Sequence, residues 1–244
     1  MAVAPSRWAR WIGLSARRAA RAGADREPDP HRGGVDPGAA LFDVPFAVVD
    51  VETTGGSPAT AALTEVAAAR YRGGECLGTF QTLVDPGHSV PPLISVLTGI
   101  TDDLLVGAPA VEGILPAFLE FVGDAVLVGH NVSFDLSFLD AALAEAGRAP
   151  LGNTTVDTLA LARRLVRPEV PNCRLRTLAT CLGLEHLPSH RALDDVRATA
   201  DLLHRLIERA TGFGVFVLGD LVDLVAAPVG QTFARPGARP ARVS

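Results

Sequence analysis

The chain contains no lysine, because all 22 positions that count as Lys or Arg among its 244 residues are arginine. It has three cysteines, and Cys76, Cys173 and Cys181 form no C-x-x-C pair. This odd number and spacing argue against a zinc site or a disulfide framework and favour a reducing compartment. The sequence also lacks an apolar run of about 18 residues and the apolar core of a secretory signal. We therefore expect a cytoplasmic protein without a membrane span.

The chain is rich in apolar residues and carries its positive charge at the ends. Hydrophobic residues make up 48% of it and charged residues 20%, which is typical of a globular protein with an ample core. The net charge of -5 excludes a protein that is basic overall and binds nucleic acid by charge alone. Residues 1–38 hold seven arginines and four acids, and residues 213–244 hold three arginines and two acids, so residues 39–212 carry -9.

These shifts in composition predict one folded domain between two tails. Residues 1–38 are expected to be a basic, disordered N-terminal tail, with an arginine-rich transit peptide as the alternative. Residues 39–212 are expected to form the functional domain. Residues 213–244 are expected to hold a short apolar segment, which can form a helix docked on that domain, followed by a Pro/Arg-rich tail.

Periodicity between the tails alternates between that of strands and that of helices. The pattern predicts strands at Phe46–Val51, Leu63–Tyr71, Gly78–Val84, Ala125–Gly129 and Thr154–Val156, with a hairpin at Arg72–Glu75. Helices are predicted at Val111–Val122, Ser133–Ala146, Thr158–Arg167, Arg174–Leu182 and Arg191–Ala210. Strands that come first as a meander and then alternate with helices predict an α/β domain, in which helices cover a mixed sheet.

Two carboxylates end the first predicted strand, in the stretch FAVVDVETTG. Asp50 and Glu52 point to the same face because side chains alternate along a strand. Burying two like charges costs several kcal/mol unless something compensates for them, and a divalent cation is the obvious compensation. A solvated strand end remains the alternative. The Thr53–Gly56 turn that follows lets a ligand approach the backbone closely.

The second signal is an acid in the stretch GHNVSFD, where a predicted strand gives way to a helix. Asp135 falls in the first turn of that helix, beside its apolar face. The helix dipole favours an acid there, so a purely structural role for Asp135 is an equal alternative. Asn131 or Ser133 can serve as the N-cap of this helix.

The third signal is the stretch PSHRALDD, which opens the longest predicted helix. A turn of 100° per residue places Asp195 along the apolar stripe and Asp194 on the solvent face. Ser189 is the expected N-cap, and His190 precedes the helix directly. Alone, such a histidine is more often a surface or capping residue. Together, the three signals gather four acids and one histidine, which two divalent metals would reconcile.

In this order, VDVETTG, HNVSFD and HRALDD resemble the three motifs of the DnaQ-like (DEDDh) 3′–5′ exonucleases. That family includes the proofreading epsilon subunit of bacterial DNA polymerase III. The stretch LTGITDDLLVGAP is also similar to the family's segment between its first two motifs. The resemblance covers about residues 41–212 and implies an RNase H-like fold, a five-stranded mixed sheet with helices on both faces.

The resemblance assigns a role to each motif residue. Asp50, Glu52, Asp135 and Asp195 would hold two divalent metal ions, Mg²⁺ or Mn²⁺, and His190 would be the general base. Water activated at one metal would attack the terminal phosphate in line, and the other metal would stabilise the leaving 3′-oxygen. The product would be a nucleoside 5′-monophosphate.

The expected substrate is a single-stranded or frayed 3′ end of DNA, since opening a paired end costs unstacking energy. Residues that would contact the terminal nucleotides are Thr53, Thr54, Leu97, Ile100, Asn131 and Phe134, although for the apolar ones a place in the core is an equal alternative. RNA remains an open substrate because the motifs do not read the 2′-OH. A replicative polymerase subunit is a possible partner. The competing class is a non-catalytic docking module, whose expected sign is the loss of one motif residue.

Overall fold

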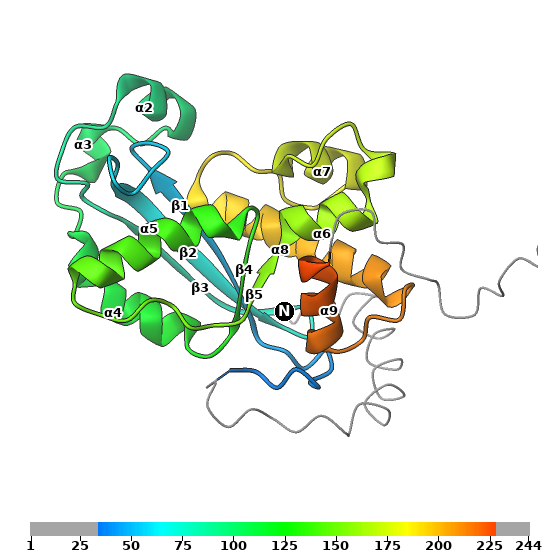
Figure 1. Cartoon of the computed structure of the whole chain (residues 1–244). Coiled ribbons are helices and arrows are strands. Elements are labelled where there is room, and N and C mark those ends of the chain that lie inside the picture. The colour runs from blue at the N-terminus through cyan, green and yellow to red at the C-terminus, as the bar shows by residue number, and fades with distance from the viewer. Residues whose placement is uncertain (1–33, 228–244) are drawn as a thin grey trace, which may run out of the picture.

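The computed structural model describes residues 34–227. Most of the two predicted tails, residues 1–33 and 228–244, lies outside the described residues. Between them, five strands and a set of helices form a layered α/β domain (Figure 1).

The strands form one mixed sheet in the order β3-β2-β1-β4-β5. Their bounds are β1 Phe46–Thr53, β2 Leu63–Arg72, β3 Glu75–Leu83, β4 Val126–Gly129 and β5 Thr155–Asp157. β1, β2 and β3 pair antiparallel, whereas β1 with β4 and β4 with β5 pair parallel. The predicted meander, its hairpin and the five-stranded mixed sheet are therefore confirmed.

Helices cover both faces of this sheet, as predicted. Their bounds are α2 Pro92–Thr98, α3 Asp102–Leu105, α4 Val111–Val122, α5 Val132–Glu145, α6 Thr158–Leu165, the 3₁₀ turn η1 Arg167–Glu169, α7 Leu175–Leu182, α8 Ala192–Thr211 and α9 Leu218–Ala226. α4 and α5 pack on one face and α6, α8 and α9 on the other, and each face buries its own hydrophobic cluster. No described helix is both long enough and apolar enough to cross a membrane.

Strand β1 shows how the sequence builds the two faces. Phe46 and Val48 belong to the cluster under α8, and Ala47 and Val49 to the cluster under α5. By the same alternation, Asp50 and Glu52 continue the face that packs on α8. The pair of acids therefore emerges where the sheet runs out under the start of that helix.

Two short helices between β3 and α4 were not predicted. α2 and α3 have seven and four residues, too few for a helical period to stand out from the sequence. They form a small lobe with a core of its own, Val90, Ile100 and Leu105. In Figure 1 this lobe lies on one side of the end of β1, and α7 lies on the other side.

Candidate active site

The end of β1 presents Asp50 and Glu52, both half-buried, to the space between α5 and α8. Thr53 and Thr54, which follow, are buried at 7% and 6% exposure. Their hydroxyls have partners within the loop: Thr53 Oγ1 donates to Gly55 O over 2.6 Å, and Thr54 Oγ1 accepts from Ala62 N–H over 3.0 Å. These bonds fix the turn that leaves the strand.

Asp135 reaches the same place from α5, since a helix that follows a parallel strand begins at that strand's carboxyl end. It is 4% exposed, and its Oδ1 accepts a hydrogen bond from Val51 N–H over 3.0 Å. The bond ties the first turn of α5 to β1, between the two acids of that strand. Asp135 thus faces the site, and its place is not explained by the helix dipole alone.

A tight turn between β4 and α5 makes this approach possible. A Cβ on Gly129 would meet atoms of Val132 at 3.0–3.1 Å, which is tighter than nearly all real side-chain contacts, so Val132 would have to shift. Asn131 has the left-handed φ of 74° and is the N-cap residue by position, but its side chain makes no capping bond. Its N–H donates to Asp157 Oδ1 over 3.0 Å. Of the two expected N-cap candidates, Asn131 holds the position and Ser133 lies inside the helix.

The loop before α8 is wrapped around the carboxylate of Asp195. The Oδ1 atom of Asp195 accepts hydrogen bonds from the backbone N–H groups of Ser189 and His190, at 2.8 and 3.2 Å. His190 takes the left-handed φ of 62°, a conformation uncommon outside glycine. The expected N-cap at Ser189 is wrong: the N-cap residue is Arg191, and the Ser189 hydroxyl donates to Asp194 Oδ2 over 2.8 Å.

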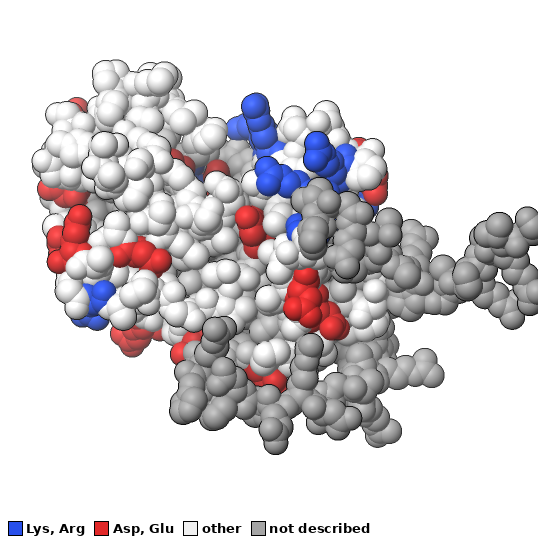
Figure 2. Space-filling model, viewed as in Figure 1, with Lys and Arg blue, Asp and Glu red and all other residues white. Residues whose placement is uncertain are grey.

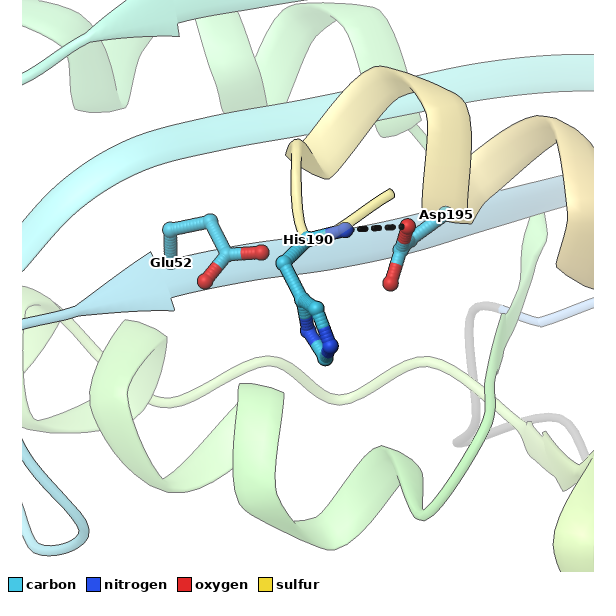
Figure 3. Close-up of side chains that lie close together, drawn as sticks. All are labelled: Glu52, His190 and Asp195. Carbon is cyan, nitrogen blue, oxygen red and sulfur yellow. Dashed lines mark hydrogen bonds between the residues drawn. The ribbon is translucent and has the colours of Figure 1, made fainter. Parts of the chain in front are cut away.

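Three of the motif residues meet in one small space. Ligand atoms of Glu52, His190 and Asp195 all lie within 4.8 Å of one another. Figure 3 shows Glu52 on β1 and Asp195 on α8 on either side of His190, with the backbone of His190 bonded to Asp195. Asp50 is close enough to interact electrostatically with Asp135, Asp195 and Glu52. The structure therefore brings together all five predicted residues, whose roles remain predictions.

Burial and mutual repulsion keep these acids from ionising easily. Burial is the main cause for each of them. It raises the pKa of Asp50 well above its usual range, helped by the nearby charges of Asp135, Asp195 and Glu52. Burial, followed by the charge of Asp195, raises the pKa of Glu52 to about 8. The pKa of Asp135 rises to about 7 and that of Asp195 also rises, against hydrogen bonds that lower both.

These carboxylates fit a hard divalent cation, which prefers oxygen ligands and would remove their repulsion. A raised folded-state pKa means that the native state binds more protons than the unfolded chain. Stability contributed by Glu52 and Asp135 is thus complete below pH 4 and is lost as pH rises to about 7 or 8.

In the presence of a chelator, we therefore expect the unfolding temperature of the protein to decrease as the pH rises from 5 to 8. Millimolar Mg²⁺ should abolish most of this decrease. In the presence of a chelator at pH 8, Asp50→Asn should raise the free energy of unfolding by about 1–2 kcal/mol, because it removes one of the mutually repelling carboxylates. Calorimetry with and without chelator measures both effects. An unfolding temperature that rises steadily with pH and ignores Mg²⁺ would contradict the electrostatic account.

Glu65 is a site-building residue that sequence reasoning missed. It is fully buried in β2, directly opposite Glu52 in the sheet register. Its carboxylate binds Arg191 through two hydrogen bonds of 3.1 and 2.8 Å and accepts from Ala192 N–H over 3.0 Å. These bonds fasten the loop that carries His190 to strand β2, beside β1. The available signal was a lone acid in the apolar run LTEVAAA.

The predicted nucleotide-contacting residues fall into three groups. Leu97 on α2 is 51% exposed, and Asn131 is exposed beside the site. Phe134 is half-buried, with its ring centroid 5.1 Å from that of Phe138. Ile100 has no exposed surface, because it fills the core of the α2–α3 lobe. The expectation that Ile100 walls a base is therefore corrected in favour of its core alternative.

The fold and the site define an α/β domain with an acidic cluster at the end of a central strand, suited to metal-assisted hydrolysis. Residues 47–203 match the RNase_T family model, described as Exonuclease. The chain belongs to this exonuclease family, so the predicted family and enzyme class are confirmed.

Sequence relatives are larger proteins. The chain is 46% identical over 189 residues to a Mycobacterium tuberculosis protein named as a candidate bifunctional exonuclease/endonuclease, covering 75% of this chain and 29% of that protein. It is 43% identical over 171 residues to the PolC-type DNA polymerase III of Halalkalibacterium halodurans, and the match covers 70% of this chain and 12% of that protein. The chain thus spans less than a third of either relative.

Solved structures share the fold. Exonuclease X in complex with 5′-overhanging duplex DNA matches with a TM-score of 0.59 and 23% identity, covering 74% of this chain and 99% of that one. Escherichia coli exonuclease I in complex with a dT13 oligonucleotide matches with a TM-score of 0.62 and 23% identity, covering 69% and 42%. The RNase H-like architecture is thereby confirmed.

Proposed function

We propose that this chain is a metal-dependent 3′–5′ exonuclease that releases nucleoside 5′-monophosphates from DNA, in proofreading or repair. The observation that carries the proposal is the cluster of Glu52, His190 and Asp195, whose ligand atoms lie within 4.8 Å of one another. Asp50 and Asp135 adjoin it, and all four acids have raised pKa values. A site that gathers this much negative charge next to a histidine has the chemistry of phosphodiester hydrolysis.

Asp50, Glu52, Asp135 and Asp195 would hold two divalent ions, Mg²⁺ or Mn²⁺. Such ions lower the pKa of bound water and neutralise charge on the scissile phosphate. His190 is exposed at the mouth of the cluster, where its ring can take the proton of the attacking water. The hydrogen bond from Val51 N–H orients Asp135, and the two N–H groups on Asp195 Oδ1 orient that carboxylate.

DNA is the proposed substrate because the sequence relatives include DNA polymerases and the structural relatives were solved with DNA. A single-stranded or frayed end is the proposed form of the substrate, because opening a paired end costs unstacking energy. A polymerase is a proposed partner on the same grounds, since the matched segment is part of a polymerase chain in H. halodurans. We place the activity in the domain over residues 39–212, with its compartment proposed to be the cytoplasm.

The test is hydrolysis of 5′-labelled single-stranded DNA and RNA of one sequence, with Mg²⁺, with Mn²⁺ or with chelator. We expect a ladder that shortens from the 3′ end with either metal, no cleavage with chelator, and faster cleavage of DNA. A duplex with a mismatched 3′ end should be cut faster than a fully paired one.

If RNA is cleaved faster than DNA, RNA replaces DNA as the proposed substrate, and the proposed chemistry still holds. No cleavage of either strand with either metal would overturn the proposed activity and favour a docking module. Shortening from the 5′ end, read with a 3′ label, would overturn the direction.

A further inference from the structure

A groove lined by arginines leads away from the acidic cluster. It has a volume of about 1080 Å³ and begins at His190, Asp195 and Asn131. Its far wall is built by α6, η1 and the start of α7, which contribute Arg163, Arg167, Arg174 and Arg176. In Figure 2, most of the blue side chains gather over this region, across a hollow with red atoms from the white lobe of α2 and α3, and a smaller blue group lies apart at the lower left.

The four groove arginines are exposed, and none of them is in an ion pair with an acid in the part of the chain that the structure describes. Four other arginines of the domain, at 191, 197, 205 and 209, are each paired with Glu or Asp. Of the eight arginines without an ion pair in residues 34–227, four thus lie together along one groove, and the other four, Arg70, Arg72, Arg148 and Arg164, lie elsewhere. Exposed charges of one sign in a concave surface attract a partner of the other sign.

The floor of the groove is held by hydrogen bonds that reach back to the site. The ring of His130, at the end of β4, lies 3.0 Å from Thr158 Oγ1 and 2.9 Å from the Cys173 carbonyl. Arg176 donates to the Pro188 carbonyl over 2.8 Å, two residues before His190. The segment that carries the arginines is therefore fixed relative to the residues at the cluster, and the groove is a built extension of the site.

We propose that this groove binds the sugar-phosphate backbone of single-stranded DNA, on the 5′ side of the nucleotide being removed. The inference rests on the proposed function, because the 3′-terminal phosphate then lies at the acidic cluster and the preceding phosphates follow the groove. Guanidinium groups suit this role because their fixed fork of donors matches phosphate oxygens. Asn172 in the same wall adds an uncharged donor.

Such a groove makes affinity depend on the length of the strand. A strand too short to reach the arginines relies on the metal site alone, whereas a longer strand gains each phosphate contact. Binding of single strands weakens with salt in proportion to the number of phosphates neutralised, with a slope of about 0.7 for each one. The dependence of affinity on strand length and on salt therefore distinguishes binding by the groove from binding by the metal cluster.

The experiment compares the triple variant Arg163→Gln/Arg167→Gln/Arg174→Gln with the control Arg72→Gln/Arg148→Gln. The control removes exposed arginines at the β2–β3 hairpin and after α5, outside the groove. Arg176 is kept because its bond to Pro188 supports the loop before α8. Fluorescence anisotropy measures the affinity for a labelled 16-mer and a labelled dinucleotide, with Ca²⁺ in place of Mg²⁺, from about 50 to 300 mM NaCl.

We expect the triple variant to bind the 16-mer about 100-fold more weakly, with a salt slope smaller by about 2, and to bind the dinucleotide within about twofold of the unchanged protein. The control should match the unchanged protein at both lengths. A triple variant with an unchanged salt slope for the 16-mer would overturn the groove proposal. So would arginine dependence with a 16-mer of RNA but none with DNA.

The result also separates the two proposals. Arginine-dependent binding of the 16-mer without hydrolysis in Mg²⁺ would leave the groove standing and overturn the proposed activity. Hydrolysis by all variants with equal Michaelis constants on a 16-mer would do the reverse.

Discussion

Replacing Asp195 with alanine should lower the turnover number on single-stranded DNA by about 10³-fold or more, since loss of a metal ligand costs several kcal/mol of transition-state stabilisation. The Asp195 carboxylate lies within 4.8 Å of the ligand atoms of Glu52 and His190. Its other role, accepting the Ser189 and His190 N–H groups, would also be lost. Single-turnover hydrolysis of a labelled oligonucleotide in Mg²⁺ measures the change.

The neighbouring Asp194→Ala is the matched control. Asp194 is 47% exposed in its side chain and makes only a long ion pair with Arg197, at 3.5 Å, and a bond to the Ser189 hydroxyl. An exposed ion pair of this kind contributes little. We expect the turnover number of Asp194→Ala to stay within about fivefold of the original. Equal losses in the two variants would show that the helix face does not decide which of the acids serves the site.

The periodic parts of the chain were predictable because their signals are local. The apolar run that begins at Phe46 predicted the strand, and the alternation of side chains along a strand predicted the shared face of Asp50 and Glu52. The structure extends the predicted strand by two residues. The helical stripe of Ala192 and Val196 predicted the buried face of α8. In each case a single period fixes which side chains point inward, without knowledge of what they meet.

Features that join distant segments could not be read in this way. Glu65 and Arg191 are 126 positions apart, and nothing near either residue names the other. The arginines of the groove come from α6, η1 and the start of α7, and only the fold shows that they line one groove without an acid as partner. Ile100 illustrates the converse: its sequence neighbourhood resembles a substrate-contacting segment, but the tertiary packing of a small lobe buries it.

Arg191→Met should reduce the free energy of unfolding by about 3 kcal/mol at pH 8, because it leaves the buried carboxylate of Glu65 without its guanidinium. The side chain of Glu65 is 1% exposed, so water cannot replace the lost partner. Burial raises the pKa of Glu65, but hydrogen bonds from Arg191, Ala192 N–H and Gln81 outweigh it and hold the pKa below its usual range. Denaturant unfolding measures the loss, with Arg205→Met, which removes an exposed ion pair, as the control.

The stability that Glu65 contributes should depend on pH with opposite signs in the original protein and in Arg191→Met. In the original protein, the lowered pKa means that Glu65 contributes stability above about pH 4.5, which is lost as pH falls through its folded-state pKa. In Arg191→Met, burial acts without the guanidinium, so the pKa of Glu65 rises and its stability contribution is lost as pH rises. The difference between the two proteins should therefore be larger at pH 8 than at pH 5.

A double variant separates the buried charge from the shape of the loop. Glu65→Gln/Arg191→Met removes the uncompensated charge and keeps an acceptor for Ala192 N–H, so it should recover more than half of the lost stability. Because the ion pair fastens the loop that carries His190, both variants should still need about tenfold more Mg²⁺ for half-maximal hydrolysis. If the double variant recovers its stability and its half-maximal Mg²⁺ concentration returns to that of the original protein, the pair only stabilises the fold. Stability that recovers while the Mg²⁺ requirement stays high would show that Glu65 and Arg191 position the site.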